Sequence, residues 1–162
     1  RWKSGERFTV KLPMEIEVVD NPVTGKSIQR GPIVYTYAIP AHWEVDPAIY
    51  DNLAGKESAN PEFVSWKITP DGKYNYALVE SGLKNMKAEY TGATGFPFDL
   101  ESVPVRIKVP VMGVKDWSII DNRYTPALPE SVETESDQVS YIELVPYGST
   151  TIRMTIFPTV EK

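Results

Sequence analysis

A period of two in the hydrophobic pattern dominates the chain. Within residues 7–18, one parity is wholly apolar, while the other carries charged and polar side chains together with Pro13. This alternation predicts a half-buried β-strand with its apolar side facing a core. Pro13 cannot donate a ladder hydrogen bond, so the strand should be bent, bulged or at a sheet edge there. The apolar positions are Phe8, Val10, Leu12, Met14, Ile16 and Val18.

Similar short runs continue along the chain, separated by turn signals. Asn21 to Gly25 reads as a turn, Gly31-Pro32 interrupts the next run, and Pro70-Asp71-Gly72 between two aromatic-rich runs predicts a hairpin. A return strand is expected after Gly113. Loops are expected at 41–60, with a short helical turn at 47–55, and at 124–137. The remaining expected strands are 28–39, 63–68, 74–79, 103–111, 114–120, 139–145 and 150–157.

These features predict an all-β fold, an antiparallel β-sandwich of jelly-roll-like form with about eight to ten short strands. Fourteen prolines and ten glycines leave no room for a long helix. We expect residues 1–162 to form a single domain. Because the sequence opens on Arg1-Trp2-Lys3 without an initiating Met, we expect a processed or truncated fragment of a larger protein.

Composition narrows the function classes. The chain has no cysteine, which excludes disulfides, thiolate metal sites and a cysteine nucleophile. Its formal net charge is −5 and its cations are scattered, which argues against nucleic acid as a partner. No apolar run is long enough to span a membrane. No motif for a nucleotide cofactor occurs, so no cofactor is expected.

Candidate catalytic groups are few. His42 is the only histidine, with Glu44 and Asp46 close by, but no nucleophile elbow accompanies it. Glu15 and Glu17 are spaced to share the solvated face of a strand. The acids between 130 and 137 lack the spacing of a calcium loop, so we predict no metal site. The favoured interpretation is that His42 is structural, that the acids are solvated and that this chain holds no catalytic residue. The alternative is a standalone enzyme that uses Glu44, Asp46 or His42.

Aromatic side chains matter if the ligand is a sugar, because the apolar faces of pyranose rings stack on Trp and Tyr. Trp66 lies in an expected strand and should be mostly core. Trp43 lies in an expected loop between His42 and Glu44. The candidate sugar contacts are therefore Trp43 and Tyr124 for stacking, with His42 and Glu44 as polar neighbours. The alternative is that these aromatic residues fill the core.

Several strings together resemble the C-terminal β-sandwich region of glycoside hydrolase family 127, the β-L-arabinofuranosidase-like proteins. The resemblance covers both ends of the chain and weakens at about 41–67 and 79–99. Tyr74-Asn75-Tyr76 is similar to a Trp-Asn-Tyr stretch of that region, with Tyr74 in place of Trp. The main strings are Trp2-Lys3-Ser4-Gly5-Glu6, Leu12-Pro13-Met14-Glu15, Arg30-Gly31-Pro32-Ile33-Val34-Tyr35, Glu143-Leu144-Val145-Pro146-Tyr147-Gly148 and Thr150-Thr151-Ile152-Arg153-Met154-Thr155-Ile156-Phe157-Pro158.

The resemblance implies that the chain is a C-terminal fragment of a larger protein, with an accessory role. In that family the chemistry belongs to an upstream (α/α) barrel with a cysteine nucleophile, so no catalytic residue carries over to this chain. The expected partner is the catalytic domain of the same, secreted or periplasmic bacterial protein, or a second subunit in a homodimer. Gly31-Pro32 and Pro146-Tyr147-Gly148 are the expected contact points. The alternative is a carbohydrate-binding module that recognises plant polysaccharide.

Overall fold

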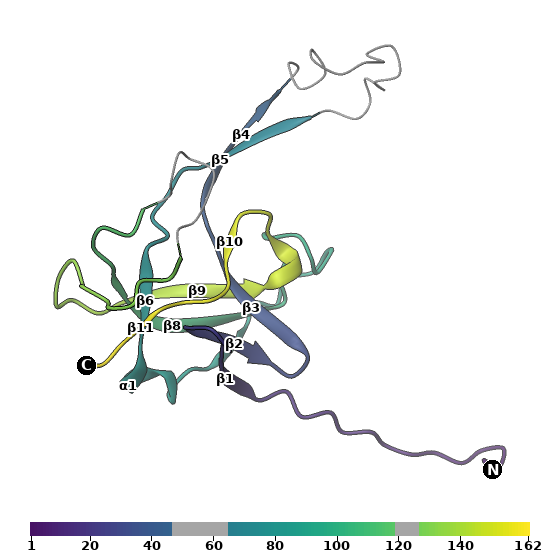
Figure 1. The fold of residues 1–162 in the computed structure, drawn as a ribbon. Helices are drawn as coiled ribbons and strands as arrows, with labels where there is room; N and C mark the ends of the chain where they lie inside the picture. Colours follow the sequence, from purple (N-terminus) through teal and green to yellow (C-terminus); the bar gives the residue numbers. More distant parts are fainter. Residues whose placement is uncertain (47–64, 119–126) are drawn as a thin grey trace.

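The computed structural model describes residues 1–46, 65–118 and 127–162. These residues form a curled nine-stranded sheet and a separate two-stranded ribbon, which confirms the all-β prediction (Figure 1). The helical elements they contain are one short turn each, α1 (Glu80–Leu83) and η3 (Tyr147–Ser149). The strands are β1 Ile16–Asp20, β2 Lys26–Arg30, β3 Ile33–Ala38, β4 Ala41–Val45, β5 Trp66–Pro70, β6 Tyr76–Val79, β7 Ala88–Tyr90, β8 Val105–Gly113, β9 Ser140–Pro146, β10 Arg153–Met154 and β11 Thr159–Val160.

The large sheet has the order β1-β2-β3-β9-β8-β6-β11, with β10 added beside β3 and β7 beside β8. Its pairs are antiparallel except β6 with β11, which run parallel. The longest strand, β8, pairs with β6, β7 and β9 and supplies the centre of the core. Its residues Ile107, Val109 and Val111 are fully buried, as the alternation in the sequence predicts.

Phe157 brings the two ends of the curled sheet together. Its backbone N–H and C=O each bond Lys26 of β2 at 2.9 Å, just before the chain enters β11 beside β6. The Phe157 ring is fully buried in the main hydrophobic cluster with Ile28, Tyr35 and Leu144. The curl of the sheet therefore encloses one core, and a buried aromatic ring lies where its ends meet.

The predicted turns and the two most regular strands are confirmed. Asn21 N–H bonds Gly25 C=O at 2.9 Å, and Gly31-Pro32 separates β2 from β3. The predicted strands at 103–111 and 139–145 correspond to β8 and β9, offset by one or two residues.

The predicted hairpin around Pro70-Asp71-Gly72 is wrong. The strand before it, β5, pairs with β4 in the ribbon, whereas the strand after it, β6, joins the large sheet. Asp71 N–H instead bonds Pro40 C=O at 2.7 Å, so this turn connects two sheets. Local turn chemistry favours a chain reversal, but the neighbour of each strand is chosen by distant residues.

Three further element predictions need correction. Residues 41–45, expected in a loop, form β4; the rest of that expected loop and the helical turn at 47–55 lie largely outside the described residues. Of the return strand expected at 114–120, the described residues 114–118 make a single bridge, Val114 with Thr134, and then a turn with Asp116 at φ 49°, while residues 119–120 lie outside the described ranges. Of the strand expected at 150–157, only Arg153–Met154 forms a strand, β10 beside β3, and Phe157 makes an isolated bridge with Lys26.

The strand expected at 7–18 forms only from Ile16 onward, as β1. The preceding residues run away from the body as an extended arm, which Figure 1 shows reaching from β1 to the N-terminus. Phe8, Val10 and Leu12 are exposed rather than buried. No neighbouring strand accepts their backbone groups within the described residues, and alternation alone does not make a strand without such a partner.

Candidate functional site

A cleft of about 470 Å³ lies at the base of the ribbon, where β3 leads into β4. We call it the Trp43 cleft, because the half-exposed indole of Trp43 forms one side. The loop with Phe98, Asp99 and Leu100 forms another side, and the chain after η3 forms the third. Its lining residues are Ala38, Ile39, Pro40, Ala41, Trp43, Phe98, Asp99, Leu100, Ser149, Thr150, Thr151 and Ile152.

Polar groups in the Trp43 cleft are mostly hydroxyls. Ser149 is buried, and its Oγ has no hydrogen-bond partner among the described residues. Thr150 Oγ1 donates to Ile152 C=O at 3.2 Å, and the Asp99 side chain adds a carboxylate. A buried hydroxyl without a partner is uncommon because its desolvation is uncompensated. An indole beside hydroxyls and a carboxylate matches the mixed apolar and polar character of a sugar ring.

His42 and Glu44 flank Trp43 in sequence but do not line this cleft. In β4 they take the opposite parity to Trp43, opposite Thr69 and Lys67 of β5, so their side chains leave the other face of the ribbon. Lys67 Nζ bonds Glu44 Oε1 at 2.7 Å, and this hydrogen bond holds the pKa of Glu44 below its usual value.

No other aromatic candidate among the described residues forms a flat stacking surface with Trp43. Tyr124 lies outside the described residues. Trp66 was expected in the core and is instead half exposed. Its ring meets Trp43 edge to face, with centroids 6.1 Å apart and planes at 72°, so the two indoles do not form a flat platform. A further tryptophan, Trp117, is buried in the main hydrophobic cluster.

A second depression, of about 600 Å³, lies on the neighbouring surface. We call it the Pro32–Tyr147 groove. It brings together the two segments expected as contact points, the Gly31-Pro32 break and the Pro146-Tyr147-Gly148 turn, and its wall is almost entirely apolar. Phe98 lines both this groove and the Trp43 cleft. The lining residues are Pro32, Ile33, Val34, Pro97, Phe98, Pro104, Pro146, Tyr147, Gly148 and Thr155.

Tight packing fixes the floor of the groove. At Gly148 a side-chain Cβ would lie 2.9 Å from Phe98 Cδ1, so the glycine allows the ring to approach the backbone of η3. Arg153 lies over the Tyr147 ring, with its guanidinium carbon 3.8 Å from the ring centroid. The guanidinium therefore holds the Tyr147 ring over the groove by a cation–π contact.

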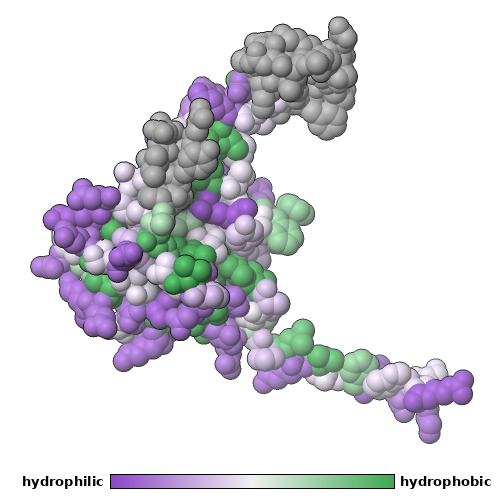
Figure 2. All heavy atoms as spheres, in the orientation of Figure 1, coloured by the Kyte–Doolittle hydropathy of each residue, from purple (hydrophilic) through white to green (hydrophobic). Residues whose placement is uncertain are grey.

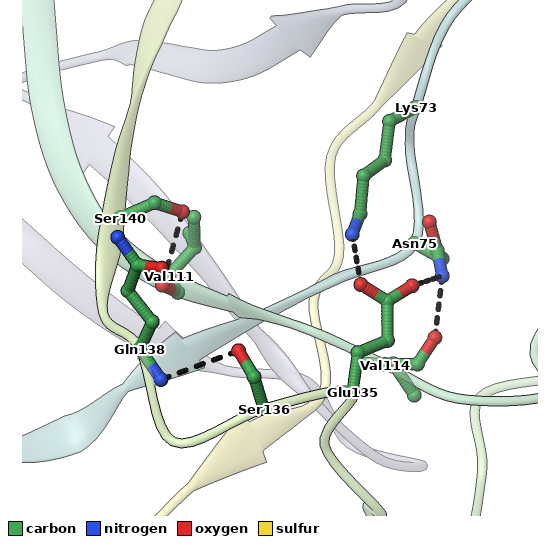
Figure 3. Close-up of polar contacts among 8 residues, drawn as sticks. All are labelled: Lys73, Asn75, Val111, Val114, Glu135, Ser136, Gln138 and Ser140. Atoms are coloured by element: carbon green, nitrogen blue, oxygen red, sulfur yellow. Dashed lines mark hydrogen bonds and ion pairs between the residues drawn. The ribbon is translucent and has the colours of Figure 1, made fainter.

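The acids near 135 are structural in this geometry. Glu135 receives hydrogen bonds from Lys73 and from the Asn75 amide, the latter at 3.0 Å, and Asn75 also donates to the backbone of Val114 (Figure 3). The bond from Lys73, with that from Asn75, lowers the pKa of Glu135. This network ties the loop after the Val114 bridge to the strand entering β6. Within the described ranges, no three His, Asp or Glu side chains gather as metal ligands would.

Sequence reasoning missed the loop at 96–100 and the hydroxyls at 149–151, which complete the cleft. Phe96-Pro97-Phe98 carried a signal, since two phenylalanines in a polar stretch without strand alternation are often exposed for contact. Both rings are largely exposed, with centroids 5.7 Å apart.

None of the helices in the described residues is long and apolar enough to cross a membrane. Comparisons with family models, with curated proteins and with solved structures gave no match to this chain.

Proposed function

We propose that this chain is a non-catalytic accessory β-domain of a secreted or periplasmic glycoside hydrolase. Its role is to pack on the catalytic domain or to pair subunits. The observation that carries the proposal is the Pro32–Tyr147 groove, an open depression whose wall is almost entirely apolar, because exposed apolar surface favours contact with another protein. Two of the strings that resemble family 127, at 30–35 and 143–148, meet in this groove although they are far apart in sequence.

A charged side chain in the groove tests this role. In calorimetric titrations against an isolated (α/α)-barrel catalytic domain of a family 127 protein, we expect binding. We expect Ile33→Asp to weaken it by roughly thirtyfold or more, because a buried, unpaired carboxylate costs at least about 2 kcal/mol. Ile33 is partly exposed at the groove.

Val23→Asp is the matched control, since Val23 is fully exposed in the turn before β2 and away from the groove. It should bind like the unsubstituted chain. Absence of any binding, or equal effects of the two substitutions, would contradict the docking role.

The Trp43 cleft favours carbohydrate binding as a second candidate function. Titration with arabinose-containing oligosaccharides and polysaccharides should then give saturable heat. Trp43→Ala should reduce the affinity about tenfold or more, because it removes the stacking face from the cleft. Trp2→Ala is the control, since Trp2 is exposed near the N-terminus and outside the cleft. Heat that Trp43→Ala leaves unchanged would place any sugar elsewhere.

A further inference from the structure

The arm, defined here as residues 7–15, carries a complete strand pattern without a partner. Phe8, Val10 and Leu12 are 66%, 64% and 75% exposed, and Figure 2 shows hydrophobic side chains along this projecting segment. The parity of these residues continues into β1, where Ile16 packs against the core. The arm would therefore present its apolar row on the core side of the sheet if β1 were extended through it.

The edge that β1 leaves open is capable of pairing along this whole length. Among the described residues β1 pairs with β2 alone. Gly31 N–H bonds Glu15 C=O at 3.2 Å, so the odd-numbered residues direct their backbone groups toward β2. In a continued strand the even-numbered residues, from Phe8 to Val18, direct theirs to the open edge.

Pro13 does not interrupt that edge. Proline in an exposed edge strand usually prevents pairing with a further strand, because it lacks an N–H donor. At an odd position, however, the missing N–H belongs to the β2 side, where β2 has already ended at Arg30. The open edge thus keeps every donor and acceptor, which is the arrangement that accepts another strand.

The charges on the outward face of the arm indicate which strand could pair with the open edge. On the odd-numbered face, the first half of the arm is basic, with Arg7 and Lys11. The end of the arm and the start of β1 are acidic, with Glu15 and Glu17. Such a strand is complementary to itself when a copy runs antiparallel, because the basic half then lies beside the acidic half. A two-fold axis produces this arrangement with the same surface on both subunits.

We propose that two copies of this chain pair through the arm and β1, antiparallel about a two-fold axis at Leu12. In this register Phe8 faces Ile16 of the second copy, Val10 faces Met14 and Leu12 faces itself, all on the core side. On the outer side Arg7 faces Glu17. The inference concerns a second surface, so it stands whether or not the Pro32–Tyr147 groove binds a catalytic domain.

Sedimentation of the 162-residue chain across a wide concentration range tests the pairing. We expect a monomer–dimer equilibrium, which Val10→Asp weakens about tenfold or more because it places two charges in a symmetric apolar row. Thr9→Asn is the control on the outer face: it has the size of Asp but places no charge opposite Glu15 of the second copy, and it should retain the dimer. Leu12→Cys should form an intermolecular disulfide on oxidation, since paired Cα atoms at the axis are about 5.5 Å apart.

A second pair of variants isolates the backbone ladder. Val10→Pro removes an N–H from the open edge and should abolish the dimer, whereas Thr9→Pro removes one from the opposite edge and should leave it intact. The proposal would be overturned if the chain were monomeric at all concentrations or formed open-ended oligomers. It would also be overturned if the dimer were weakened equally by the substitutions at positions 9 and 10. Ile33→Asp should leave the dimer unchanged, which separates this result from the test of the groove.

Discussion

Replacing Phe157 by alanine is expected to lower the free energy of unfolding by about 3–5 kcal/mol. The ring is fully buried among the apolar residues of the core, and its backbone bonds Lys26 in both directions. Alanine keeps those backbone bonds but leaves a cavity where the two ends of the curled sheet meet. Neighbouring strands cannot collapse into it without breaking the pairing of β11 with β6.

Urea unfolding followed by circular dichroism measures this loss. Phe96→Ala is the matched control, since the Phe96 ring is largely exposed, and it should change stability by no more than about 0.5 kcal/mol. Equal midpoints for the two variants would show that the Lys26–Phe157 junction contributes little to the closure of the sheet.

Gly25→Ala is expected to cost about 2–4 kcal/mol, from two causes. Gly25 has φ +80°, a conformation that disfavours a side chain. A Cβ there would also lie 2.5 Å from Leu128 Cδ1 and 2.7 Å from the carbonyl oxygen of Phe157. Because that oxygen accepts the Lys26 N–H, the backbone can move aside only by loosening the same junction.

Gly92→Ala separates the two causes. Gly92 has φ +69° but nothing within 4 Å of the added Cβ, so alanine there should cost only the conformational strain, about 1–2 kcal/mol. The difference between the two variants in thermal or urea unfolding measures the crowding at Gly25. If the two losses are equal, the packing around the turn before β2 is more tolerant than this geometry implies.

A strand was predictable from the sequence wherever its hydrophobic alternation was accompanied by a neighbouring strand to pair with. The alternation of residues 103–111 predicts the buried face of β8, and the turns at Asn21 and Gly31 follow from local chemistry that needs no distant residue. The same alternation at 7–15 gave the wrong result, because a strand also requires hydrogen-bond partners. The described residues offer none there.

The site was less predictable than the fold. Trp43 was identified from its sequence surroundings, and it does line a cleft. Its polar neighbours in sequence, His42 and Glu44, leave the other side of the ribbon because side chains alternate along β4. The hydroxyls that accompany Trp43 come from the end of η3 and the chain just after it, more than a hundred residues later, and no local pattern links the two segments.

The sequence by itself determined the all-β class, the core face of β8 and the turn positions, because periodicity and turn chemistry act between near neighbours. Only the tertiary structure decided which strands pair. In particular, β5 pairs with β4 rather than with β6, and Phe157 bridges to Lys26 where the ends of the sheet meet. It also decided that Pro32 and Tyr147 share one groove. These outcomes depend on backbone hydrogen bonds and packing between residues distant in sequence, which a period of two does not encode.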